Sequence, residues 1–77
     1  MKYIIVHWSY EYAGNRNEYE KKLFSNIQSA KNYILSKEDI DFKEGEIIQA
    51  LAMNNDLEPK HSWGGNCFKI EDIDFVE

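Results

Sequence analysis

The chain has 77 residues, 14 of them acidic and 9 basic, and a formal net charge of -5 at pH 7. That length allows a single domain, residues 1–77, with one hydrophobic core, and a content of 43% hydrophobic and 14% aromatic residues excludes a disordered chain. The one cysteine excludes an internal disulfide, and no apolar run is long enough for a membrane span or a signal peptide, so we expect a soluble cytoplasmic protein.

Residues 2–12 alternate between two side-chain faces and are rich in β-branched and aromatic residues, which predicts a strand. Both faces are apolar at the start of this segment, which favours a place inside the sheet rather than at its edge. Residues 13–17 contain the Gly and Asn that turns need, and residues 18–24 alternate again. Together the three segments predict a hairpin.

Two helices are expected in the middle of the chain. Ser25, followed three positions later by Gln28, matches a capping box and predicts a helix that ends at about Ser36. Its sheet-facing side chains would be Ile27, Ala30 and Ile34, and its solvent-facing side chains Gln28, Lys31 and Asn32. A second helix is predicted at about 46–55, where strong helix formers carry apolar residues at helical spacing, and a strand is the alternative there.

The last third of the chain predicts two strands, 57–63 and 67–76, joined by a loop of Gly64, Gly65 and Asn66. Pro59 is tolerated there only at an edge of the sheet or before strand pairing begins. The expected fold is therefore α+β: an antiparallel sheet of three or four strands with one or two helices packed on one face, in the order β-β-α-(α)-β-β.

One short segment, residues 61–68 (HSWGGNCF), could carry a thiol site. His61 and Cys67 would be near neighbours across a hairpin, and a cysteine nucleophile needs such a base. However, the glycines suit a tight turn, and a lone cysteine in a strand is most often a small buried hydrophobe. The spacing of one cysteine and two histidines matches no zinc site, and the common catalytic signatures are absent. We therefore expect a protein that is not an enzyme and has no metal or cofactor.

Acidic residues gather in two segments that are candidate partner-binding surfaces. The first holds Glu38, Asp39, Asp41, Glu44 and Glu46, and the second holds Glu71, Asp72, Asp74 and Glu77. Such residues can simply keep a small protein in solution. Alternatively, they complement a basic groove that normally holds nucleic acid. Direct binding of nucleic acid is disfavoured, because the Lys and Arg residues are not clustered.

Another candidate surface is the strip of Tyr3, Ile5 and His7 on one face of the first strand. If helices cover only the opposite face of the sheet, this strip is exposed, and exposed apolar strips mark a protein partner or a homodimer interface. The candidate partner-binding residues are thus Tyr3, His7, Glu38, Asp39, Asp41, Glu71, Asp72 and Asp74.

Three features occur together in this chain: a strand–turn–strand opening (YIIVHWSYEYAGNRNEYEKKLF), a capped helix (SNIQSAKNYI) and an acidic closing strand. This layout resembles that of small accessory proteins of phages and mobile elements, among them anti-CRISPR and anti-restriction inhibitors. The resemblance implies a stoichiometric binder that blocks a defence nuclease, or its nucleic-acid site, in the host cytoplasm. Two alternatives stay open: recognition of a small ligand between subunits, and a miniature enzyme that uses Cys67 and His61.

Overall fold

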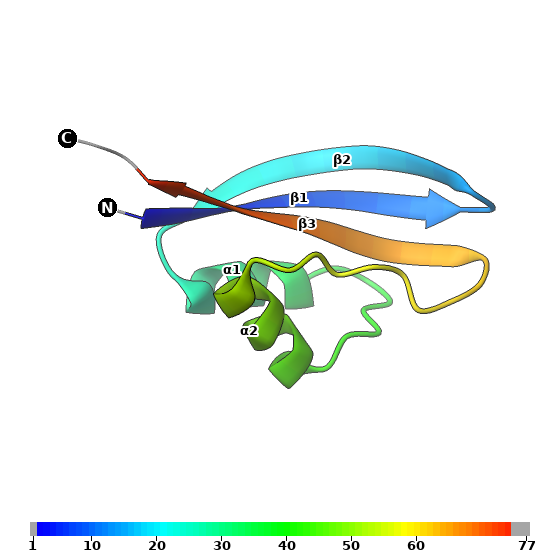
Figure 1. Ribbon diagram of the computed structural model, residues 1–77. Coiled ribbons are helices and arrows are strands. Elements are labelled where there is room, and N and C mark those ends of the chain that lie inside the picture. The colour runs from blue at the N-terminus through cyan, green and yellow to red at the C-terminus, as the bar shows by residue number, and fades with distance from the viewer. Residues whose placement is uncertain (1, 75–77) are drawn as a thin grey trace.

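The computed structural model describes residues 2–74, which form a three-stranded antiparallel sheet with two helices on one of its faces (Figure 1). The elements are β1 (Lys2–Tyr12), β2 (Asn15–Phe24), α1 (Ile27–Leu35), α2 (Glu44–Met53) and β3 (Gly64–Asp74). The strand order is β2-β1-β3, so β1 lies in the centre, as its two apolar faces predicted. The α+β class is confirmed, whereas residues 75–76 of the expected last strand lie outside the described residues.

The β1–β2 hairpin is tighter than expected. Its turn consists of Ala13 and Gly14 alone, with φ of 50° and 84°. Positive φ at both positions is the geometry of the two-residue turns that match strand twist. As a result, β2 begins at Asn15 rather than at residue 18. A bulge between Trp8 and Ser9 shifts the register and leaves Tyr19 as an extra residue on β2.

Both helices form, but α1 begins differently from the prediction. Asn26, not Ser25, is its N-cap, and the Asn26 side chain accepts a 2.8 Å hydrogen bond from the backbone N–H of Ser29. Lys31, expected to face solvent, is buried because its Nζ lies 2.7 Å from Glu44 Oε1 at the start of α2. This ion pair joins the two helices at the surface of the core.

The helix α2 confirms the helical interpretation of its segment and excludes the strand. It begins at Glu44, two residues earlier than predicted, and ends at Met53. The backbone N–H of Lys43 donates to the Glu46 side chain over 3.1 Å, which stabilises the first turn. Asn54 follows in the left-handed conformation with φ of 58°, which ends the helix.

The core lies between the helices and the sheet face that they cover. Its members are Ile4, Val6, Ala30, Ile34, Phe42, Ile47, Ala50, Leu51, Leu57, Phe68 and Ile70. Val6 and Ile34 are fully buried at the centre of this set. Burial of each such side chain contributes ~1.5–3 kcal/mol, so this one core accounts for most of the stability of so short a chain.

The expected strand at 57–63 does not form, and the predicted loop is wrong. That segment meets β3 only at isolated bridges, Leu57 with Phe68 and His61 with Gly64. The turn lies at residues 61–64, where the Gly64 N–H donates to His61 O over 3.1 Å. Gly64, Gly65 and Asn66 begin β3 instead of joining two strands. Pro59, which has no N–H to donate, accounts for the lack of continuous pairing in this segment.

Candidate functional site

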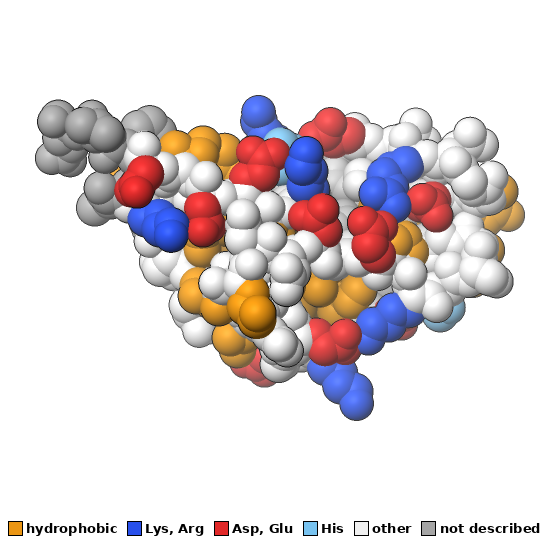
Figure 2. Space-filling model, in the orientation of Figure 1, with side chains coloured by type: hydrophobic (Ala, Val, Ile, Leu, Met, Phe, Trp, Pro, Cys, Tyr) orange, Lys and Arg blue, Asp and Glu red, His pale blue; other side chains and the backbone are white. Residues whose placement is uncertain are grey.

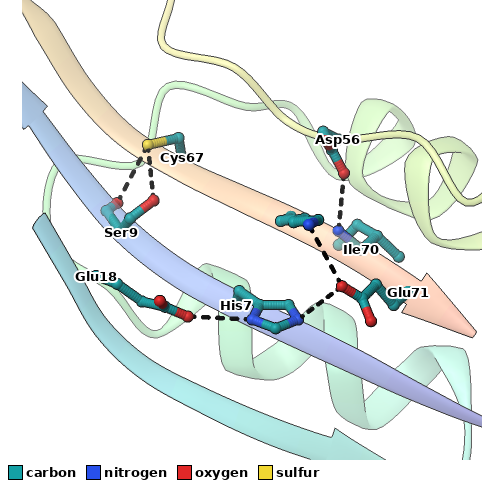
Figure 3. Close-up of polar contacts among 8 residues, drawn as sticks. His7, Ser9, Glu18, Asp56, Cys67, Ile70 and Glu71 are labelled. Atoms are coloured by element: carbon teal, nitrogen blue, oxygen red, sulfur yellow. Dashed lines mark hydrogen bonds and ion pairs between the residues drawn. The ribbon is translucent and has the colours of Figure 1, made fainter. Parts of the chain in front are cut away.

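The two residues proposed for a thiol site have different neighbours. Cys67 Sγ lies 3.1 Å from Ser9 Oγ and 3.5 Å from Ser9 O, and the side chain is buried (Figure 3). His61 instead bonds to the Asp41 carboxylate and stacks on Trp63 with ring centroids 4.9 Å apart. The imidazole is therefore engaged elsewhere. Cys67 behaves as the small buried residue that its place in a strand suggested.

The open face of the sheet carries a polar cluster around His7 (Figure 3). His7 Nδ1 lies 3.1 Å from Glu18 Oε1, and Nε2 lies 3.2 Å from Glu71 Oε1. Lys69 Nζ lies 3.5 Å from the same oxygen of Glu71. Tyr3 shares this face, because it alternates with the buried Ile4 along β1. The structure thus brings three candidate residues, Tyr3, His7 and Glu71, to one face of the sheet.

The acidic C-terminal segment does not form one patch. Glu71 lies on the open face, whereas Asp72 pairs in register with Ile4 on the helix face and lies 3.5 Å from Lys2 Nζ. Strand alternation alone produces this division. Asp74 ends β3, and Glu77 lies outside the described residues.

Most acidic residues of the 38–46 segment have basic partners. Asp41 bonds to His61, Glu44 to Lys31 and Glu46 to Lys60. Figure 2 shows the same mixing, with acidic and basic side chains interleaved over the visible face. Glu38 and Asp39 differ, because within residues 2–74 their carboxylates have no ion pair or hydrogen-bond partner.

These two free carboxylates lie beside a hollow of about 470 Å³ on the helix side of the sheet. We call it the aromatic hollow, and its lining residues are Trp8, Tyr10, Tyr19, Ser36, Lys37, Glu38, Asp39 and Asn66. The three aromatic side chains come from the β1–β2 hairpin, and residues 36–39 come from the turn after α1. The bulge on β2 places Tyr19 here, with its ring centroid 5.0 Å from that of Trp8.

Asn66 fixes the two walls of the aromatic hollow relative to each other. Its Oδ1 accepts a 2.9 Å hydrogen bond from Trp8 Nε1, and its Nδ2 donates to Glu38 O over 2.7 Å. Asn66 is only 7% exposed, so these bonds are shielded from competing water. Asp39, which follows Glu38 in the chain, has φ of 56°, a left-handed conformation that Asp tolerates better than most residues. These hydrogen bonds hold the walls of the hollow in place.

A cation already contacts the aromatic wall. Lys37 Nζ lies 4.2 Å from the ring centroid of Trp8 and 4.4 Å from that of Tyr33. It also lies 3.6 Å from Glu20 Oε1, which accepts a 2.6 Å hydrogen bond from the Tyr33 hydroxyl. Cation–π contacts of this length are favourable, and these show that the wall suits positive charge.

The Tyr33–Glu20 hydrogen bond shifts both pKa values. The Tyr33 hydroxyl, followed by the charges of Lys22 and Lys37, lowers the pKa of Glu20 below its ordinary 4.5. Burial, followed by the bond to Glu20, raises the pKa of Tyr33 above its ordinary 10.0. Ionised Glu20 therefore stabilises the fold above pH 4.5 and ceases to do so as pH falls through its folded pKa. Neutral Tyr33 stabilises it below pH 10.0 and ceases to do so as pH rises through its folded pKa.

We expect Tyr33→Phe to flatten the stability profile at both ends, since the substitution removes the hydroxyl that couples the two groups. Urea unfolding midpoints between about pH 3 and about pH 11 would measure this. Glu46→Gln is the matched control. The pKa of Glu46 is lowered mainly by Lys60, so this variant should flatten only the acid limb. An alkaline limb that is unchanged in Tyr33→Phe would contradict the expectation.

Sequence reasoning did not find the aromatic hollow. Asn66 was expected in a loop, and Trp8 and Tyr10 were not among the candidate site residues. In the structure, Trp8 is only partly buried against the core. The helices α1 and α2 do not reach the far end of the β1–β2 hairpin, so no helix covers the sheet there (Figure 1). The bulge and the register of β3, neither visible in the sequence, complete the site.

The fold and the site define a small α+β protein with one open sheet face and one aromatic hollow. Within residues 2–74, no helix is long and apolar enough to cross a membrane, and no three His, Cys, Asp or Glu side chains are grouped to hold a metal ion. No protein-family model, curated protein or solved structure matches this chain. The chemistry of the aromatic hollow is therefore the basis for assigning a function.

Proposed function

We propose that the protein is a non-catalytic binding module that docks on a basic surface of a protein partner. The observation that supports this most is the pair of free carboxylates, Glu38 and Asp39, beside the aromatic hollow. Aromatic residues provide large rigid contact areas, and charge complementarity speeds and orients association. Most other carboxylates are paired within the chain. The surface around Glu38 and Asp39 is therefore the one most available to bind a cation of another molecule.

A basic surface that holds nucleic acid is the class of partner that fits this chemistry best. Such surfaces cluster Lys and Arg to bind phosphate, and an acidic module that covers them excludes the nucleic acid. The resemblance to anti-CRISPR and anti-restriction inhibitors points to the same class, with a host defence nuclease complex in the cytoplasm as the target. The module itself does not present the Lys and Arg cluster that nucleic acid requires.

The proposal is tested by affinity capture from a lysate of the host cells, followed by purification of the captured partner. We expect nucleic acid to compete for that partner. We also expect the association rate to fall between low and physiological salt, where the Debye length shortens to about 8 Å. The paired variant Glu38→Gln with Asp39→Asn should slow association, while Lys substitutions at Glu71, Asp72 and Asp74 should affect it less. Binding that is insensitive to salt and to the paired variant would show the proposal to be wrong.

A small cationic ligand is the second candidate function. The aromatic hollow, at about 470 Å³, falls within the range of ~300–1,000 Å³ that is typical of ligand pockets. Native mass spectrometry of the purified protein would detect such a ligand as added mass. Its displacement by the captured partner would show that both use the aromatic hollow.

A further inference from the structure

We propose that the aromatic hollow is the binding site for one arginine side chain of the protein partner. This inference rests on the proposed function and names the group that the hollow recognises. The occupant is argued from charge and shape. The walls are aromatic, the two carboxylates beside them are unpaired within residues 2–74, and the lining has a formal charge of -1 from Lys37, Glu38 and Asp39. An anion would be repelled by both carboxylates, whereas a cation would form ion pairs with them.

The position of Lys37 shows where one cation is stable in the hollow. It also shows that this cation leaves Glu38 and Asp39 without a partner. The Lys37 ammonium group is held by Trp8, Tyr33 and Glu20. It therefore satisfies a carboxylate on β2, while Glu38 and Asp39 on the adjoining turn have no partner. A second positive group has two carboxylates to bind and the ring of Tyr10 to lie against.

Arginine fits these requirements better than lysine does. The guanidinium group is planar, stacks on aromatic rings and offers five N–H donors in a fixed fork, so it can stack and bind carboxylate oxygens at the same time. An ammonium group is a compact charge with a strong hydration shell, and the hollow already contains one. The hydrogen bonds of Asn66 keep the hollow rigid, and this favours a rigid planar ligand. Binding between two rigid groups loses little conformational entropy.

The first test titrates the ¹⁵N-labelled protein with three blocked tripeptides, Gly-X-Gly, in which X is arginine, lysine or citrulline. The indole N–H of Trp8 and the side-chain amide of Asn66 report on the hollow, and Trp63→Phe identifies the Trp8 signal. We expect saturable shifts with the arginine peptide at a dissociation constant on the order of 1 mM, and binding at least about fivefold weaker with lysine. Citrulline, which keeps the shape and loses the charge, should give no saturable shift.

The second test uses variants that change the charge of the hollow in opposite directions. Glu38→Gln with Asp39→Asn should abolish saturation by the arginine peptide. Asn is also tolerated at positive φ, so the turn is preserved. Lys37→Gln should tighten binding, by about threefold or more, because it removes a competing positive charge. The matched control Lys21→Gln, whose side chain lies on the opposite face of the sheet, should leave the affinity unchanged.

Specific outcomes would overturn the inference. Equal shifts with citrulline, a lysine peptide that binds as tightly as the arginine peptide, or weaker binding in a folded Lys37→Gln protein would each do so. Melting temperatures of all variants would establish that they fold. If the captured partner binds through Glu38 and Asp39 but the arginine peptide does not saturate, this inference fails and the proposed function stands. If the arginine peptide binds but the paired variant leaves partner capture unchanged, the proposed function fails instead.

Discussion

Replacing Gly64 with alanine should lower the free energy of unfolding by more than ~3 kcal/mol, because backbone strain and overpacking each cost ~1–3 kcal/mol at such a site. Gly64 has φ of 122°, a conformation that residues with a side chain rarely adopt. A Cβ atom there would lie 2.0 Å from the carbonyl oxygen of Glu11 on β1. Backbone atoms in a paired strand cannot move aside without loss of the β1–β3 ladder. A domain of this size has only ~4–11 kcal/mol to lose in total.

The other glycines provide graded controls for urea unfolding. Gly65 has φ of 132° but its nearest Cβ contact would be 3.8 Å, so Gly65→Ala carries strain without the clash. Gly14 has φ of 84° in open space, and its alanine variant should cost only ~1 kcal/mol. Gly45→Ala in the first turn of α2 should be neutral or stabilising by up to ~1 kcal/mol. If Gly64→Ala proves no more destabilising than Gly65→Ala, the close approach of β3 to β1 is wrong.

Gly64 also shows why the sequence predicted the elements better than their connections. Alternation along β1 and helical spacing in α1 and α2 are local signals, and those elements formed where they were expected. A pair of glycines, however, has the same appearance in a hairpin loop and in a strand that passes very close to another backbone. Only the pairing of β3 with β1, which joins residues more than fifty positions apart, decides between the two. The fourth strand was expected because that pairing could not be read from the sequence.

The candidate site depends even more on tertiary structure. Local sequence showed which segments are acidic, and it brought Glu38 and Asp39 into the list of candidates. It could not show that Glu44 and Glu46 are paired with Lys31 and Lys60, since those partners lie thirteen and fourteen positions away. What distinguishes Glu38 and Asp39 from the other acidic residues of the 38–46 segment is therefore the absence of partners within residues 2–74, a property of the folded chain.

The second large effect is expected at Asn66, whose side chain connects Trp8 to the turn after α1. Asn66→Leu has a similar volume but leaves the Trp8 indole N–H and the Glu38 carbonyl without their partner. Each polar group left unsatisfied away from water costs ~1–3 kcal/mol, so the loss of both partners should lower the free energy of unfolding by ~2–6 kcal/mol. The matched control is Asn32→Leu on the exposed side of α1, where the amide accepts only a 3.4 Å bond from Gln28. That variant should stay within ~0.5 kcal/mol of the parent protein.

Urea unfolding measures the stability loss, and the Trp8 indole N–H signal shows whether the hollow keeps its shape. In Asn66→Leu, loss of the 2.9 Å hydrogen bond should move that signal and speed its exchange with water. Asn66→Asp keeps an acceptor for the indole but loses the donor to Glu38 O, so it should retain the signal while the turn loosens. Asn66→Leu should weaken binding of the arginine peptide, because a turn that is free to move no longer holds Glu38 and Asp39 beside the aromatic rings. A folded Asn66→Leu protein with unchanged stability and unchanged peptide binding would mean that Asn66 does not organise the hollow.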